Sequence, residues 1–166
     1  MASKTKPVKV PVVLQMEALE CGAASLAMVL AYYKKWVPLE EVRTACGVSR
    51  DGSNALDIIK AGQSYGLEDK GYRYSPASVR NKAVFPCIVF WSNSHFVVLD
   101  GFKDNNAFIN DPGEGSILFK YGLCQKSDRK TVCNIQCLFH APYPSDADGI
   151  LLPAPFRRSG AESNVQ

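Results

Sequence analysis

The sequence lacks the features that would place it in a membrane or a secretory pathway. No apolar run approaches the ~18 residues of a membrane-spanning helix. The N-terminal MASKTKPVK has no apolar core of a secretory signal. We therefore expect a cytoplasmic protein in a reducing setting, with its six cysteines as free thiols. Cys46 and Cys87 lie in apolar runs and are expected to be buried.

Three further features that the sequence lacks or has little of narrow the class of function. The net charge is only +3 and the basic residues are scattered, which is not the concentrated basic face of a nucleic-acid binder. The sequence has no G-x-x-x-x-G-K-[ST] loop, so we expect this chain not to hydrolyse ATP itself. It has only two histidines, His95 and His140, which limits the choice of a catalytic base.

The first part of the chain has the spacing of helices. Ala18 to Tyr33 carries apolar residues three and four apart, which predicts a helix with one strongly apolar face. Val37–Gly47 predicts a second helix with Pro38 in its first turn. Gly52–Gly66 predicts a third, with Ser53 or Asn54 as its N-cap.

The pattern then changes to strands. Residues 70–75 alternate like a strand, and a short helix is predicted over 75–82. Residues 85–91, 95–102 and 107–111 are β-branched and aromatic runs separated by polar turns, which predicts an antiparallel meander. Helices followed by such a sheet predict an α+β fold. We expect a flexible tail over 1–8, one domain over 9–120 and an irregular segment over 121–166, where the periodicity is lost.

Cys21 is the first candidate for chemistry. It lies near the start of the first predicted helix, where the helix dipole favours a thiolate. Gly22 would leave space beside it for a substrate carbonyl. The backbone N–H of Cys21 and the side-chain amide of Gln15 would be two donors for an oxyanion. Taken alone, a cysteine at this place is more often an ordinary structural thiol of a core helix.

His95 and Asp111 supply the partners that a cysteine nucleophile needs. His95 begins an apolar strand and is the candidate base, and Asp111 ends the next strand and would orient the imidazole. The alternatives are a structural strand histidine and an aspartate that only forms the Asp-Pro-Gly turn. The two side chains share a face only if the hairpin has an odd loop or a bulge, because strand residues alternate between faces. Such a Cys–His–Asp order, on a helix and then a sheet, is typical of papain-like cysteine proteases.

These residues also carry a family resemblance. Gln15, Glu20, Cys21 and Gly22 match one motif, and His95-Phe96-Val97-Val98 with Asp111-Pro112 match another. Over roughly residues 9–115 the chain resembles the peptidase C39 family, the double-glycine leader peptidases found at the N-terminus of bacteriocin- and lanthipeptide-exporting ABC transporters.

The resemblance implies a papain-like fold and cleavage of a precursor peptide after a Gly-Gly, Gly-Ala or Gly-Ser pair that ends a helical leader. It implies Cys21 as nucleophile, His95 as base and acid, Asp111 as orienting group and Gln15 as oxyanion donor. It implies no cofactor or metal. The partners would be the precursor peptide and, in the family, fused transmembrane and ATP-binding domains.

The chain departs from the family after Ser116 and has no transporter part, so we expect an excised, stand-alone or truncated domain. The departure also predicts a sheet that lacks one or two strands. A zinc site at Cys124, Cys133, Cys137 and His140 is a weaker hypothesis, since the spacing has no C-x2-C pair. Three other functions remain open: a module of the same fold that binds a leader without cutting it, a papain-like amidase or transglutaminase, and an inactive scaffold.

Overall fold

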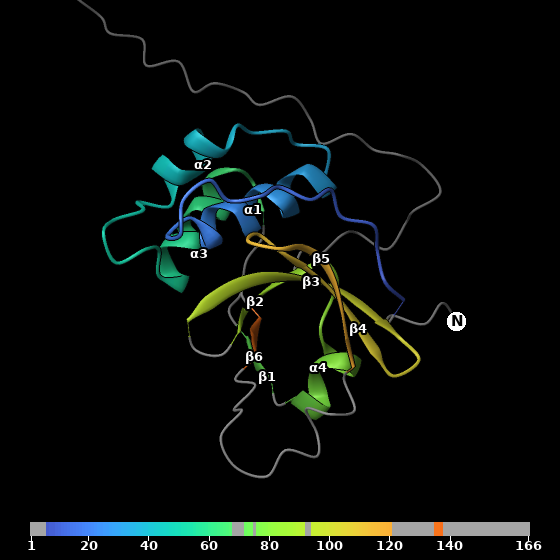
Figure 1. Ribbon diagram of the computed structural model, residues 1–166. Helices are drawn as coiled ribbons and strands as arrows, with labels where there is room; N and C mark the ends of the chain where they lie inside the picture. Colours follow the sequence, from blue (N-terminus) through green and yellow to red (C-terminus); the bar gives the residue numbers. More distant parts are fainter. Residues whose placement is uncertain (1–5, 68–71, 75, 92–93, 121–134, 138–166) are drawn as a thin grey trace, which may run out of the picture.

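The protein is a sheet covered by helices on both faces (Figure 1). The computed structural model describes residues 6–67, 72–74, 76–91, 94–120 and 135–137. Helices α1, α2 and α3 gather on one face of the sheet, and α4 lies on the other face (Figure 1). Two apolar cores result, one on each face. The predicted α+β class is confirmed.

The helices lie where the spacing of apolar residues predicted them. They are α1 Cys21–Tyr32, α2 Leu39–Ala45, α3 Ala55–Ser64 and α4 Pro76–Lys82. Asn54 caps α3 because its side-chain oxygen accepts the backbone N–H of Asp57 at 2.9 Å. Pro38 precedes α2 as its N-cap rather than lying in its first turn. The predicted boundaries were therefore wider than the helices themselves.

Helix α1 is buried around its whole circumference. Every residue from Gly22 to Ala31 is buried, because α2 and α3 cover one side of the helix and the sheet covers the other. The prediction of a single apolar face was too narrow. A helix that is apolar on all sides belongs to the interior of a domain, so α1 is fixed in place by its surroundings.

Within the described residues the sheet has six strands, in the order β1-β6-β2-β3-β4-β5. Their bounds are β1 Tyr72–Tyr74, β2 Cys87–Trp91, β3 His95–Lys103, β4 Asn106–Asp111, β5 Gly115–Lys120 and β6 Ile135–Cys137. All the pairings are antiparallel; β2, β3 and β4 form the predicted meander, and β5 extends it by one strand.

Strand β6 corrects the expectation for the end of the chain. It pairs with β1 on one side and with β2 on the other, so residues from beyond 120 contribute to the same sheet. The prediction of an irregular segment over 121–166 is wrong for Ile135–Cys137, which form β6. The expectation that the sheet lacks one or two strands relative to the family stays a prediction. The remaining residues of that segment lie outside the described part of the chain.

A bulge in β3 sets the register of the β3–β4 hairpin. Lys103 pairs with Asn106 across a two-residue turn, whereas Val98 pairs with Asn110, and the register shifts between Leu99 and Gly101. Without this shift Asp111 would lie opposite Val98. With it, Asp111 lies one step beyond the Val98–Asn110 pair, opposite Val97. Val97 and His95 share a face, so the predicted condition for bringing His95 and Asp111 together is met.

The N-terminal segment packs against this bulge. The N–H of Val8 donates to the carbonyl of Asp100 at 3.0 Å. Gly101 has φ of +141°, and a Cβ at this position would lie 2.8 Å from Cα of Pro7. Residues 7 and 8 are therefore part of the packed structure, and the prediction of a flexible tail over 1–8 is wrong for them. Residues 1–5 lie outside the described part of the chain.

Candidate active site

Cys21 is the first residue of α1 and is partly buried as a free thiol. The helix approaches β3 closely at this end, where the Ser25 hydroxyl donates to the carbonyl of Phe96 at 3.2 Å. This contact fixes the first turn of α1 against the start of β3. Cys21 and His95 are therefore neighbours although 74 positions separate them in the sequence.

His95 is held between Cys21 and Asp111. Its Nε2 lies 2.9 Å from Oδ1 of Asp111, and the other ring nitrogen is left for the hydrogen bond with Cys21. The same Asp111 oxygen accepts the backbone N–H of Gly113 at 2.7 Å. Asp111 thus forms the Asp-Pro-Gly turn and also contacts the imidazole, so both interpretations of this residue hold.

The electrostatics of the pair favour charge separation. Burial would raise the pKa of the Cys21 thiol, but the hydrogen bond with His95, the backbone amides of Phe96 and Gly22 and the charge on His95 together lower it. The pKa of the His95 imidazole is raised to about 9, mainly by its hydrogen bond with Cys21, against the effect of burial and with help from Asp111. A thiolate beside an imidazolium is the reactive form of such a pair.

Gln15 lies beside the aspartate end of the site. Its backbone N–H donates to the carbonyl of Pro112 at 2.8 Å, which ties the segment before α1 to the turn that carries Asp111. The side-chain Oε1 is buried without a hydrogen-bond partner in the described part of the chain. Of the four residues predicted from the sequence, Cys21 begins α1 and Gln15 lies in the segment before it. His95 begins β3 and Asp111 ends β4, at the adjoining ends of these two strands.

Gly22 has a different role from the expected one. A Cβ at this position would lie 2.6 Å from Cδ1 of Ile58 and 3.4 Å from Cδ2 of Phe96. The space beside Gly22 is therefore occupied by α3 and β3, and it is not open to a substrate carbonyl. Gly22 permits the close packing of α1 that brings Cys21 to His95.

One group that acts on Cys21 is not predicted from the sequence. The backbone amide of Phe96, the residue after His95, lowers the pKa of Cys21. A backbone donor has no signature in the side-chain pattern, although its neighbour His95 marks where it lies.

No group of three or more His, Cys, Asp or Glu side chains suitable for a metal occurs in the described ranges. Of the zinc hypothesis, Cys124, Cys133 and His140 lie outside those ranges, and Cys137 ends β6. No helix among the described residues is long and apolar enough to cross a membrane.

Comparison with known proteins decides the family. The profile of the Peptidase C39 family matches residues 9–123. The chain belongs to the peptidase C39 family. The expectation of a papain-like cysteine peptidase is confirmed by this membership and by the match to solved peptidase domains.

Similar proteins include a solved double glycine motif protease from an AMS/PCAT transporter in complex with its leader peptide. It is 57% identical, with a TM-score of 0.75, over 82% of this chain and 94% of that one. The peptidase domain of Streptococcus ComA, a bi-functional ABC transporter involved in quorum sensing, has a TM-score of 0.67 at 21% identity. That match covers 81% of this chain and 98% of the other, and it supports the fold alone.

Two similar proteins from Escherichia coli are much longer. The probable microcin-H47 secretion/processing ATP-binding protein MchF and the colicin V secretion/processing ATP-binding protein CvaB are each 33% identical over 107 residues. These matches cover 64% of this chain and only 15% of the relatives. The chain thus corresponds to a small part of these secretion proteins.

Proposed function

We propose that this chain is a cysteine endopeptidase that removes the leader of a bacteriocin- or lanthipeptide-type precursor after a Gly-Gly, Gly-Ala or Gly-Ser pair. The observation that carries the proposal is the row formed by Cys21, His95 and Asp111, in which the imidazole contacts the thiol on one side and the carboxylate on the other. The similarity to a protease solved with a leader peptide supports this substrate class.

The chemistry follows from the contacts. The Cys21 thiolate attacks the carbonyl carbon of the second residue of the small pair and forms a tetrahedral intermediate. His95 then gives its proton to the leaving amine, the C–N bond breaks, and a thioester remains on Cys21. Water attacks the thioester while His95 takes one of its protons, which releases the leader and restores the thiolate–imidazolium pair.

The oxyanion needs donors on the side of Cys21. The backbone N–H of Cys21 is one, because the first N–H groups of a helix have no partner within the helix. The side-chain amide of Gln15 is the other, since its segment is tied to the Asp111 turn beside the imidazole. Two such donors stabilise the charge that develops in the transition state more than the ground-state carbonyl.

The relatives support a proposal for the cellular setting. We propose that the chain works at the cytoplasmic face of a bacterial membrane with transporter domains, because similar sequences occur within secretion/processing ATP-binding proteins. We further propose that the cut requires a small pair because a large side chain next to the scissile bond would collide with the walls of the substrate cleft.

The proposal is tested by incubating the chain with a set of synthetic leader peptides that carry Gly-Gly, Gly-Ala, Gly-Ser or Val-Val before the core peptide. We expect mass spectrometry to show one cut, after the small pair only, and no cut with Cys21→Ala. Asp111→Ala should cost less turnover than Cys21→Ala, because an orienting group can be lost without removing the nucleophile.

If the unmodified chain binds a leader peptide tightly but yields no cleavage product, it is a leader-binding module and not a peptidase. Cleavage of the Val-Val peptide at the same rate would contradict the specificity. Loss of all activity in Asp111→Ala together with loss of the native circular dichroism spectrum would show that Asp111 is needed for folding instead.

A further inference from the structure

Glu20 is a buried acid that the proposed chemistry does not use. The residue is 3% exposed and directly precedes Cys21. Its Oε2 accepts the backbone N–H groups of Met16 and Glu17, both at 3.0 Å. Its Oε1 contacts Nη1 of Arg43 from α2 at 3.0 Å. Burial of a carboxylate is costly unless it is paired and hydrogen-bonded, and here both oxygens are.

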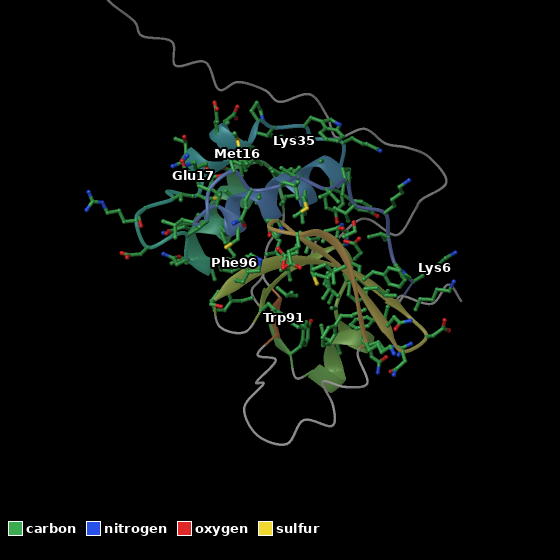
Figure 2. All side chains as sticks on the ribbon, viewed as in Figure 1. Lys6, Met16, Glu17, Lys35, Trp91 and Phe96 are labelled. Atoms are coloured by element: carbon green, nitrogen blue, oxygen red, sulfur yellow. The ribbon has the colours of Figure 1, made fainter. Side chains whose placement is uncertain are left out.

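These contacts fold the segment that joins Gln15 to Cys21. Met16 follows Gln15, and Glu20 precedes Cys21, so the carboxylate closes a loop between the proposed oxyanion donor and the nucleophile. The side chains inside the loop give it little packing, since Met16 is 82% exposed and Leu19 is 41% exposed. Figure 2 places Met16 and Glu17 beside α2, on the outer side of α1. The loop is therefore held mainly by Glu20 at one end and by Gln15 on Pro112 at the other.

Glu20 does not act as an ordinary helix cap. It occupies the N-cap position of α1, but its side chain makes no capping hydrogen bond to the helix. The carboxylate instead points back to the preceding loop, where the amides of Met16 and Glu17 lie. The carboxylate of Glu20 therefore does not occupy the first amides of α1, and the N–H of Cys21 stays available for a substrate oxyanion.

The chemistry of the partners explains why the residue is an acid. Two amides and a guanidinium are all donors, and a carboxylate has enough lone pairs for the three, whereas an amide side chain would turn its own NH2 group toward one of them. Arg43 also offsets the negative charge that lies one residue from Cys21. Without Arg43 this charge would disfavour a thiolate at Cys21.

We propose that Glu20, held by Arg43, is a positioning residue that sets where Gln15 lies relative to Cys21 during peptide cleavage. The inference rests on the proposed function. Its effect should be seen in the oxyanion-stabilising step, so that kcat falls while KM changes little.

The test is a double-mutant cycle between Glu20→Ala and Gln15→Ala, measured as kcat and KM for a Gly-Gly leader peptide. Loss of one oxyanion donor costs roughly 10²–10³-fold in kcat. We expect Glu20→Ala to lower kcat by at least about tenfold and the double variant to be within about threefold of Gln15→Ala, because both changes remove the same interaction. A double variant whose fold-loss in kcat equals the product of the two single fold-losses would overturn the proposal.

Glu17→Ala is the matched control. Glu17 also pairs with Arg43, at 3.2 Å, but its side chain is 62% exposed and holds no backbone amide of the loop. We expect this variant to keep kcat within about twofold of the unmodified chain, because exposed pairs contribute little. Equal losses in Glu17→Ala and Glu20→Ala would show that only the charge around Arg43 matters, which contradicts the proposal. Glu20→Gln, which keeps the side-chain volume, replaces Glu20→Ala in the cycle if the alanine variant does not fold.

A readout without substrate separates this inference from the proposed function. Hydrogen exchange of the Met16 and Glu17 amides should speed up in Glu20→Ala but not in Glu17→Ala, while alkylation of Cys21 by iodoacetamide stays near the unmodified rate. Unchanged exchange, or a large fall in alkylation, would refute the positioning of Gln15 by Glu20. If the unmodified chain cleaves no leader peptide, the proposed function fails and exchange still decides whether Glu20 holds the loop.

Discussion

The substitution Gly22→Ala tests how closely α1 is packed. The new Cβ would lie 2.6 Å from Cδ1 and 3.3 Å from Cγ1 of Ile58, and Ile58 is fully buried, so it cannot turn into solvent. Overpacking of a core costs about 1–3 kcal/mol. Alanine in a helix recovers at most about 0.5–1 kcal/mol relative to glycine. We therefore expect a net loss of about 1–2 kcal/mol in the free energy of unfolding.

The contact with Ile58 is isolated by adding Ile58→Val, which removes the Cδ1 atom that the alanine would meet. Ile58→Val alone should cost about 0.5–1.5 kcal/mol. The double variant should lose less than the sum of the two single losses, with an interaction of at least about 0.5 kcal/mol. Urea unfolding followed by circular dichroism measures all four proteins of the cycle.

The same cycle has a second readout at the site. The new Cβ would also lie 3.4 Å from Cδ2 of Phe96, whose backbone amide lowers the pKa of Cys21. Alkylation of Cys21 should slow in Gly22→Ala and recover in the double variant. A neutral Gly22→Ala, or strictly additive losses, would refute the argument that close packing requires glycine here.

Further outcomes follow from the same contacts. Gln15→Ala should lower turnover by roughly 10²–10³-fold with little change in unfolding, and unchanged turnover would remove Gln15 from the site. The pH profile of kcat/KM should rise at a pH below 9, because the pKa of Cys21 is lowered, and fall as the pH passes about 9, where His95 loses its proton. Asp111→Asn should move the falling limb to lower pH, because it removes one contribution that raises the pKa of His95. Burial raises the pKa of Asp100 to about 7, so the folded chain loses stability as this group ionises between about pH 4 and about pH 7. Over this pH range, urea unfolding should show that the free energy of unfolding falls less for Asp100→Asn than for the unmodified chain.

The helices and the meander could be predicted because their patterns are local. Apolar residues three and four apart locate α1 to within three residues, and β-branched runs locate the ends of β2, β3 and β4 to within two residues. The cores on the two faces follow from alternation along these strands. Family motifs then supplied what local patterns do not, namely which Cys, His and Asp belong together.

The register and the last strand could not be predicted for different reasons. The bulge near Gly101 depends on the close approach of Pro7, which is a contact between residues far apart in the sequence. Strand β6 has three residues, too few for an alternation to be recognised, and its neighbours β1 and β2 lie far away in the sequence. The sequence also predicts open space for a substrate carbonyl beside Gly22, because it does not reveal that Ile58 fills this space.

The place of β6 has a consequence for the order of events during synthesis. Strands β2 to β5 are made in succession and each pairs with the one before it, so the hairpin that carries His95 and Asp111 can form as soon as residue 111 is available. The outer edge of β2 and the whole of β1 receive β6 only after residue 137 has been made. A nascent chain in this interval exposes an unpaired strand edge, which is the kind of surface on which chains aggregate. Translation of residues 121–137 is therefore the interval in which a chaperone would most improve the yield of folded protein.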